Sequence, residues 1–310
     1  MDCDEVEGTF FDYIVSFSQG NPLYMKELLK YIKTMSLFHI SDHTVFLKKN
    51  IEKIPNSLQG LILSKLNNIS KEATEVIQAA SIIGKTFTTS VLDQLLDKNI
   101  DSNDLLKEAA DSNIIYLKST YTNGSIKEKL YSFSHDTERE TIYNSILNKN
   151  KIYYHKETAK AIEATYAINI ESYFEVLGEH FEKGDEPLMA ASYYTNAAEH
   201  YKRLFNTQEA LIYFLKAYNC KSILKLAGAD KIYRICVQIG ELYTMISDFA
   251  NAKLFLVRAL KYTEDINEKW AVELKIARTY VEQAKYTEAT SILDRIQVTM
   301  KQNNKLYGNL

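Results

Sequence analysis

One histidine of the chain stands where its side chain could contact an anion. His135 is followed by Asp136 within residues 131–143, Y-S-F-S-H-D-T-E-R-E-T-I-Y. Apolar residues predict a strand before this pair, from Leu130, Tyr131 and Phe133, and a helix after it, from Ile142, Ile146 and Leu147. At a strand-to-helix junction, side chains and free backbone N–H groups can both point toward a phosphate or a carboxylate. The pair is therefore a candidate anion-contact site.

The other candidates for catalysis or metal binding do not form a constellation. Glu138 and Glu140 are predicted on different faces of the following helix, most simply in solvent. His39 and His43 are four residues apart, the spacing of a helical metal pair, but no helix is indicated there and two solvated loop histidines are expected. We therefore expect no catalytic residue, no metal site and no enzyme activity within these residues.

A loose phosphate-loop pattern lies at residues 79–86, A-A-S-I-I-G-K-T, in which Ala79 replaces the first Gly of G-x-x-x-x-G-K-[ST]. Such a loop wraps backbone N–H groups around phosphates when a flexible glycine-rich segment joins a strand to a helix. Here residues 71–83 have helical periodicity, and Ile82 and Ile83 make the supposed loop apolar. We expect no nucleotide contact from Lys85.

The composition is that of a core-forming, mainly helical protein. Of 310 residues, 46% are hydrophobic and 25% charged, and only 10 Gly and 3 Pro are present, which fits long helices joined by short connections. The formal net charge of -3 offers no attraction for nucleic acid or an anionic membrane, so neither partner is expected. Cys3, Cys220 and Cys236 are expected to be buried free thiols. The acidic start and the absence of a long apolar run predict a cytoplasmic protein.

Residues 18–22, S-Q-G-N-P, interrupt a helical pattern near the start of the chain. Two helices are predicted to meet there at a tight turn, with Asn21 capping the second and Pro22 in its first turn. Any capped helix start would show the same residues. Residues 33–53 are expected to form a connector with a short strand at residues 44–47.

Residues 55–133 are predicted to form several helices closed by a β-hairpin. Helix starts are expected at Pro55-Asn56, at Ser70 and near Thr89, with a fourth helix at residues 101–110. Strands at residues 114–117 and 130–133 would flank a tight turn at Asn123-Gly124. This order is the outline of a winged helix-turn-helix. Its candidate recognition helix, residues 101–111, holds four acidic residues and one lysine, so DNA contact is not expected.

A repeat dominates the chain from residue 173 onward. Small residues recur in pairs twelve apart, at Gly178 and Ala190, Ala198 and Ala210, Gly240 and Ala252, and Ala277 and Ala289. Large residues return at fixed offsets: an aromatic three after the first small residue (Phe181, Tyr201, Tyr243, Tyr280) and a large one four after the second (Tyr194, Phe214, Leu256, Leu293). Small residues let antiparallel helices approach, and large ones three or four apart fill the gap between them.

This pattern resembles the tetratricopeptide repeat. Its four matches start 20, 42 and 37 residues apart, from residues 178, 198, 240 and 277, rather than the usual ~34. The first two are predicted to share a helix at residues 187–203, and no clear capping helix precedes Gly308-Asn309-Leu310. An α-solenoid is therefore expected, either as a partner-binding surface or as a helical stack without a ligand.

Taken in order, these segments resemble the C-terminal half of a STAND-class, AAA-like signalling ATPase. The motifs that carry the resemblance are G-N-P-L-Y-M-K-E-L-L from residue 20, I-P-N-S-L-Q-G-L-I-L-S-K-L from residue 54, A-A-S-I-I-G-K-T-F from residue 79 and Y-S-F-S-H-D from residue 131. The resemblance implies a helical lid at residues 1–50, a winged helix at 51–168 and a repeat sensor at 169–310. The P-loop and Walker B strand of the family's core have no match here.

The resemblance also implies a nucleotide contact. In STAND proteins the Pro of a G-x-P element lies against the adenine, and the His of an H-D element touches the ADP β-phosphate in the off state. Gly20 and Pro22, and His135 and Asp136, match these positions. ADP or ATP would then be bound only together with the N-terminal core. From the residues alone, His135 could equally cap its helix or fill the core of the winged helix.

Two functions follow as expectations. The first is a regulatory portion of a nucleotide-dependent switch, in which the lid and winged helix contact ADP and the repeats bind an inducer or partner protein. The alternative is a free-standing repeat adaptor that binds a peptide or protein without nucleotide.

Overall fold

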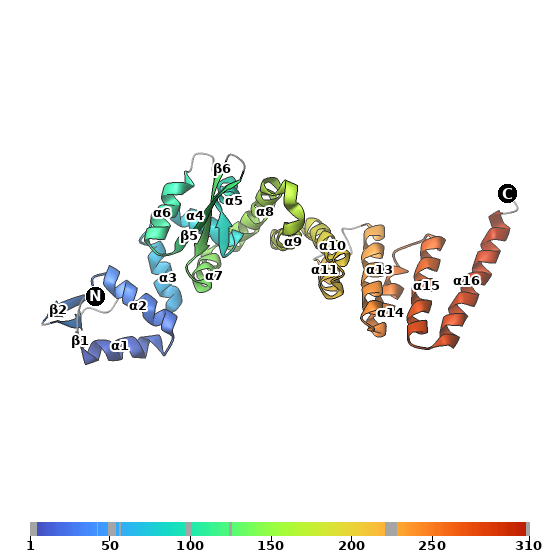
Figure 1. Ribbon diagram of the computed structural model, residues 1–310, viewed down its shortest axis with the longest axis horizontal. Helices are drawn as coiled ribbons and strands as arrows, with labels where there is room; N and C mark the ends of the chain where they lie inside the picture. Colours follow the sequence, from blue (N-terminus) through green and yellow to red (C-terminus); the bar gives the residue numbers. More distant parts are fainter. Residues whose placement is uncertain are drawn as a thin grey trace. The chain divides into compact units, whose positions relative to one another are not determined.

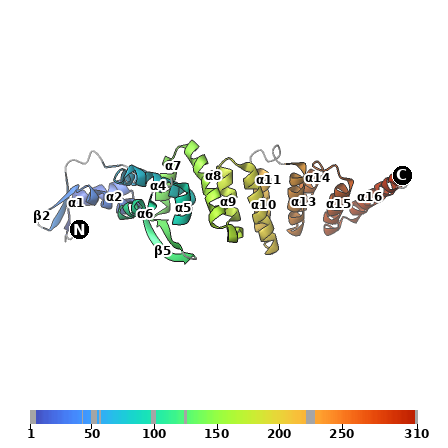
Figure 2. The ribbon, with the colours of Figure 1, turned by 90° about the horizontal axis from the view of Figure 1, so that it is seen from above.

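The computed structural model describes residues 5–41, 43–48, 54–55, 57–96, 101–123, 126–220 and 228–307. The chain divides into two compact units, Met1–Tyr154 and His155–Leu310, which are described separately (Figures 1 and 2). Both are mainly helical, which confirms the predicted class. The expected boundary at residues 50–51 and the predictions for Cys3, Asn56, Gly124 and Gly308–Leu310 lie outside the described residues.

Two helices and a small sheet form the start of the first unit. Helices α1 (Gly8–Ser18) and α2 (Pro22–Thr34) are accompanied by strands β1 (Glu5–Val6), β2 (Phe38–Ser41) and β3 (Thr44–Leu47) in the order β1-β3-β2. Strand β2 runs antiparallel to β3 with Phe38 opposite Leu47. The strand predicted at residues 44–47 is confirmed. The neighbouring β2 was not predicted because three of its four residues are exposed, so it lacks an apolar alternation.

The core of this part is continuous with the next helix. Side chains from both helices and β3 meet Leu61 of α3 (Leu58–Leu66), and the buried set is Phe10, Ile14, Tyr24, Leu28, Ile32, Val45 and Leu61. The Tyr24 hydroxyl also donates to the backbone carbonyl of Pro55 at 3.1 Å. Apolar packing therefore holds α2 against α3, and a hydrogen bond holds α2 to the segment before α3.

A second layer of the first unit combines helices with an antiparallel sheet. It contains α4 (Lys71–Ile83), α5 (Thr89–Leu95), α6 (Ser102–Asp111), α7 (Asp136–Ser145) and strands β4 (Thr86–Thr88), β5 (Ile115–Asn123) and β6 (Ile126–Phe133). The strand order is β4-β6-β5, with Ile115 opposite Phe133. The predicted hairpin and the cap at Ser70 are confirmed, since the Ser70 hydroxyl oxygen accepts from the Ala73 N–H at 3.2 Å.

Two expectations for this layer need correction. Strand β4 was not predicted, because three residues directly before a helix carry too short a pattern. Leu147, expected on the face of the helix after His135, lies beyond its end at Ser145 and is 73% exposed. Ile142 is buried on the helix as expected, and Ile146 is also buried, although it is the C-cap of the helix and lies just beyond its end.

The second unit is a solenoid of helical hairpins (Figure 1). Helix α8 (Asn148–Thr165) crosses the boundary between the units and is followed by the 3₁₀ helix η1 (Ala167–Tyr173). The hairpin helices are α9 (Phe174–Lys183), α10 (Pro187–Arg203), α11 (Thr207–Asn219), α13 (Ala229–Met245), α14 (Phe249–Ala259), α15 (Ile266–Glu282) and α16 (Tyr286–Tyr307). Helix α10 packs against both α9 and α11, so the predicted sharing of one helix by two repeats is confirmed.

All eight small residues of the repeat are buried where paired helices approach. A Cβ atom added to Gly178 would lie 2.5 Å from the ring of Tyr194, and one added to Gly240 would lie 2.6 Å from Leu256 Cγ. The twelve-residue spacing therefore marks the contact between the two helices of each hairpin.

The four hairpin turns share one backbone geometry. Asp185, Phe205, Ser247 and Ala284 each have a positive φ, between 56° and 63°. The N–H of the following residue donates at 2.9 Å to the carbonyl of the aromatic residue of the repeat: Glu186 to Phe181, Asn206 to Tyr201, Asp248 to Tyr243 and Lys285 to Tyr280. This pattern caps each first helix, although none of the left-handed positions holds Gly.

Leu293 departs from the predicted pattern. Its counterparts Tyr194, Phe214 and Leu256 are buried, whereas Leu293 is 44% exposed. Helix α16 is the last one described, and no following helix of the described chain covers this side chain.

Candidate functional site

His135 occupies the junction between β6 and α7, as the sequence predicts. It is the N-cap of α7 and is half-buried. Its backbone N–H donates to Glu138 Oε2 at 3.1 Å, which orients the first turn of the helix. Asp136 is exposed and forms an ion pair with Lys85, with 2.8 Å between Oδ2 and Nζ.

Lys85 has a partner in this ion pair, so its position does not require a phosphate-binding loop. Residues 71–83 form a continuous helix with Gly84 as its C-cap, so the pattern at residues 79–86 lies mostly inside α4. The absence of a loop there confirms the helical interpretation. Lys85 and Asp136 are both more than half exposed, so their pair contributes little to stability.

Gly20 and Pro22 lie at the turn between α1 and α2. Gln19 and Gly20 both have positive φ, 47° and 78°, and Gly20 tolerates this without a Cβ penalty. The Asn21 side chain accepts from the N–H groups of Leu23 and Tyr24 at 3.0 and 3.2 Å, and Pro22 is the first helical residue. The predicted cap is confirmed, and the exposed Gly20 and Pro22 are accessible to a ligand.

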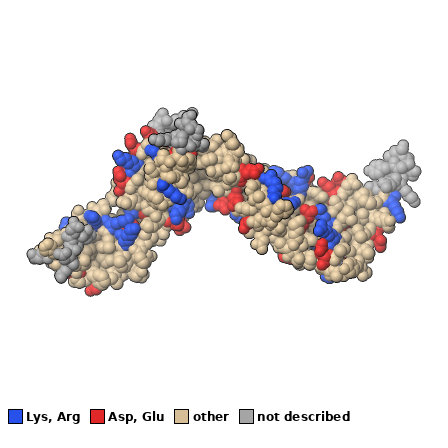
Figure 3. Space-filling model, in the orientation of Figure 1, with Lys and Arg blue, Asp and Glu red and all other residues tan. Residues whose placement is uncertain are grey.

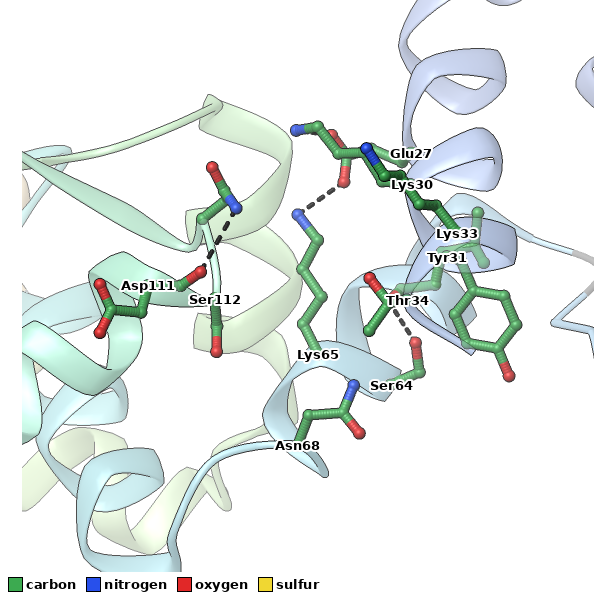
Figure 4. Close-up of a pocket in the computed structure, with 12 residues that line it drawn as sticks. Glu27, Lys30, Tyr31, Lys33, Thr34, Ser64, Lys65, Asn68, Asp111 and Ser112 are labelled. Carbon is green, nitrogen blue, oxygen red and sulfur yellow. Dashed lines mark hydrogen bonds and ion pairs between the residues drawn. The ribbon is translucent and has the colours of Figure 1, made fainter. Parts of the chain in front are cut away.

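A partly buried lysine connects the two helices that begin at these elements. Lys65 of α3 places its Nζ 2.6 Å from Glu27 Oε2 on α2 and 2.5 Å from Glu138 Oε1 on α7. Glu27 also pairs with Lys30 at 2.9 Å. Figure 4 shows Lys65 reaching from its helix toward Glu27. The helices that start at Pro22 and after His135 are therefore tied to one ammonium group.

The two carboxyl groups that share Lys65 differ in their pKa values. Burial acts to raise both. At Glu27 the hydrogen bonds and charges of Lys65 and Lys30 outweigh burial, so the pKa of its carboxyl lies below the usual value. At Glu138 burial outweighs Lys65, and the nearby charge of Glu27 adds to it, so that pKa lies above the usual value. Burial opposes charge on Lys65, but both carboxylates raise its pKa. The charged cluster therefore depends on all three partners.

A cleft of about 320 Å³ opens beside this cluster. Its walls come from α2, α3 and the turn after α6, and Figure 4 shows Lys30, Lys33 and Lys65 with Glu27 and Asp111 around it. Lys33 forms no ion pair with any residue that the structure describes. The wall charges nearly balance, so the cleft by itself does not specify an anion.

Three residues of this cluster were missed or misassigned from the sequence. Glu138 was expected in solvent, which is wrong: its side chain is buried against Lys65. Its position three residues after the N-cap is that of a capping-box glutamate, and this spacing could have indicated an inward-turned side chain. Glu27 and Lys65 gave no comparable signal, since nothing in the sequence pairs α2 with α3.

The structure does not join the predicted contact residues directly. No hydrogen bond or ion pair connects Gly20 or Pro22 with His135 or Asp136 among the described residues. The two elements are connected through Lys65, which pairs with Glu27 in the helix that begins at Pro22 and with Glu138 in the helix that begins after His135.

Other histidines serve structure within the described residues. His39 lies on β2, not in the loop expected for it, and stacks on Phe46 at 5.3 Å between ring centroids. His155 and His180 were not singled out from the sequence. They are buried in the second unit with their Nδ1 atoms 2.9 Å apart, so one imidazole donates to the other and joins α8 to α9. No group of three or more metal-ligating side chains occurs among the residues described.

Within the part of the chain that the structure describes, no helix has the length and apolar character needed to cross a bilayer. Basic and acidic side chains are interspersed over the face shown in Figure 3.

No protein-family model matches the chain, and no curated protein matches it either. Solved structures similar to this chain include the following two. One is BtubC (BKLC) from P. vanneervenii, with 15% identity over 54% of this chain and 71% of that chain at a TM-score of 0.38. The other is a Signal Transduction ATPase with Numerous Domains (STAND) protein with a tetratricopeptide repeat sensor from Pyrococcus horikoshii, with 11% identity and a TM-score of 0.30. That match covers 93% of this chain but only 56% of the STAND protein. At such low identities and TM-scores, these likenesses carry no argument on function.

Proposed function

We propose that this chain is the regulatory portion of a nucleotide-dependent signalling protein of the STAND class. In this proposal the first unit is the lid and winged helix, Gly20, Pro22, His135 and Asp136 contact ADP bound to an N-terminal core, and the solenoid binds an inducer or partner protein. Nucleotide hydrolysis belongs to the core, and the described residues contribute contacts only.

The observation that supports it most is the placement of Lys65. The two elements matched to nucleotide contacts stand at the N-termini of α2 and α7, and Lys65 ties both helices together through Glu27 and Glu138. A nucleotide held at both ends would bind most tightly when the two helices keep this arrangement. Differential affinity for such a closed state is what a switch requires.

His135 would act by charge-assisted hydrogen bonding to a phosphate oxygen. Its ring is half-buried at the helix start, where the N-terminus of α7 also favours an anion. Exposed Asp136 is paired with Lys85, which offsets its negative charge next to a phosphate. Pro22 would provide an apolar surface for the adenine ring.

The test uses the full-length protein with its nucleotide-binding core. His135→Ala should speed ADP dissociation by about 10- to 100-fold, because a hydrogen bond to a charged group contributes about 1.5–3 kcal/mol. It should also raise basal output. His39→Ala, which removes an exposed histidine from β2, is the matched control and should leave ADP release unchanged. An unchanged ADP dissociation rate in His135→Ala would refute the nucleotide contact.

A second candidate function is a repeat adaptor that binds a peptide or protein without nucleotide. It is favoured by the solenoid forming a compact unit of its own. A strand followed by G-x-x-x-x-G-K-[ST] upstream of residue 1 in the reading frame would exclude the adaptor, and its absence there would favour it.

A further inference from the structure

The solenoid contains a groove of about 440 Å³ between α10 and α13. Phe214 of α11 and Ile235 of α13 are among its lining residues, and both are buried, so they close its base. Helices α10, α11 and α13 follow one another in the stack (Figure 1). The groove therefore has an apolar base and walls formed by two helices.

Its two walls differ in chemistry. The α10 wall presents Ser192, Thr195 and Asn196, which are three and four residues apart and share one helix face. The α13 wall presents Lys231 and Arg234, again on one face. The α10 wall thus offers neutral hydrogen-bonding groups and one carboxylate, Glu199, while the α13 wall is basic.

Asn196 of the α10 wall and Lys231 of the α13 wall are available to a ligand, whereas the Thr195 hydroxyl donates to the carbonyl of Ala191 at 2.7 Å within α10. Neither Asn196 nor Lys231 forms a side-chain hydrogen bond or ion pair with a residue that the structure describes. Arg234 pairs with Asp230 at 3.1 Å, but both side chains are well exposed, 73% and 64%, and such a pair exchanges readily with another carboxylate. Glu199 is the one carboxylate among the described lining residues. The lining therefore favours an anionic partner over a cationic one.

We propose that this groove binds an acidic peptide segment of a partner protein. Carboxylates of the peptide pair with Lys231 and Arg234, its backbone meets the amide of Asn196, and an aliphatic side chain covers the apolar base. This assignment rests on the proposed role of the solenoid as the partner-binding part, and it names the chemistry of that partner. An extended peptide suits such a site because its side chains alternate between the base and the walls.

The test is selection of short random peptides displayed on phage against the purified chain, followed by affinity measurement with the synthesised peptides. We expect the selected peptides to be rich in Asp and Glu. Charge reversal by Lys231→Glu with Arg234→Glu should weaken their binding by at least about 100-fold, about tenfold for each charged pair lost. Lys231→Ala with Arg234→Ala, the milder change, should weaken it by about tenfold or more.

A matched control is present in the same solenoid. Arg278 is 75% exposed and pairs with Glu282 four residues away, as Arg234 pairs with Asp230, and Lys261 is exposed. Lys261→Glu with Arg278→Glu changes the net charge equally and should leave affinity unchanged. Circular dichroism of each variant verifies the fold.

Three outcomes would overturn the assignment: no peptides selected, peptides that are neutral or basic, or acidic peptides whose binding both double variants weaken equally. None of these outcomes involves nucleotide. If the groove test fails but His135→Ala releases ADP faster, only the acidic partner is rejected. If the groove test succeeds but His135→Ala releases ADP at the wild-type rate, only the nucleotide contact is rejected.

Discussion

At the scale of single residues, Lys65 compensates two carboxylates inside the first unit. Side chains of Glu27 and Glu138 are almost fully buried, and each lies within 2.6 Å of the Lys65 ammonium group. Removing one partner from a buried ionic group costs more than the pair contributes, because the remaining charge stays desolvated. Because the pKa values of the two glutamates shift in opposite directions, their contributions to the free energy of unfolding can be separated by varying the pH.

Glu138→Gln and Glu27→Gln should change the pH dependence of stability in opposite directions. Folding raises the pKa of Glu138. The wild type therefore loses stability as pH rises from the usual pKa of 4.5 through the pKa in the folded state, and this loss should be absent from Glu138→Gln. The pKa of Glu27 is lowered by folding, so its contribution is present above 4.5 and is lost as pH falls through the folded value.

Urea denaturation at a series of pH values measures both effects. Glu140→Gln, at an exposed position of the same helix, is the control and should follow the wild-type curve. Parallel curves for Glu27→Gln and Glu138→Gln would contradict the assignment of opposite shifts.

At the scale of elements, the close approach of α9 and α10 requires a glycine. The ring of Tyr194 fills the space in front of Gly178, and its hydroxyl donates to Glu182 Oε2 at 2.7 Å, so the ring is fixed at both ends. The corresponding pair, Gly240 and Leu256, has a flexible aliphatic side chain in place of a ring. A larger residue at the glycine position should therefore be tolerated better in the hairpin of α13 and α14 than in the hairpin of α9 and α10.

Gly178→Ala should destabilise the second unit by about 1–3 kcal/mol, the usual range for overpacking, despite the gain of up to about 1 kcal/mol in helix propensity. Gly240→Ala should cost less, because Leu256 can adopt another rotamer. Gly8→Ala, where no atom lies within 4 Å of the added Cβ, should be neutral or slightly stabilising. Thermal denaturation compares the three, and equal stability of Gly178→Ala and Gly8→Ala would disprove the tight contact.

At the scale of the whole molecule, the chain divides into two compact units, which we expect to unfold separately. Trp270 is the only tryptophan and lies on α15, with its ring N–H donating to Thr299 at 3.2 Å, so its fluorescence reports on the second unit. Circular dichroism reports on both units.

Lys65→Met should therefore lower the free energy of unfolding of the first unit by about 3–5 kcal/mol, because it leaves buried carboxylates without their partner. Dichroism should detect this change, whereas the Trp270 fluorescence transition should not move. Gly178→Ala should shift the fluorescence transition instead. A common shift of both signals in either variant would show that the chain unfolds as one cooperative body.

Local patterns sufficed for much of the fold. The helix caps at Asn21 and Ser70, the hairpin of β5 and β6 and the eight buried small residues of the repeat were all predictable, because each depends on residues close in sequence or on one repeated contact. The four left-handed hairpin turns were not, because Asp185, Phe205, Ser247 and Ala284 share no residue type.

In the candidate site, too, some features follow from the local sequence and others depend on the fold. By itself, the sequence determined that His135 stands at a strand-to-helix junction and that Pro22 begins a helix, since both follow from local periodicity and capping. Only the tertiary structure decided that Glu138 is buried and that Lys65 joins it to Glu27, because these side chains come from three helices far apart in the chain. Long-range charge pairing leaves no periodic trace in a sequence, so the connection between the two predicted contact elements required the fold.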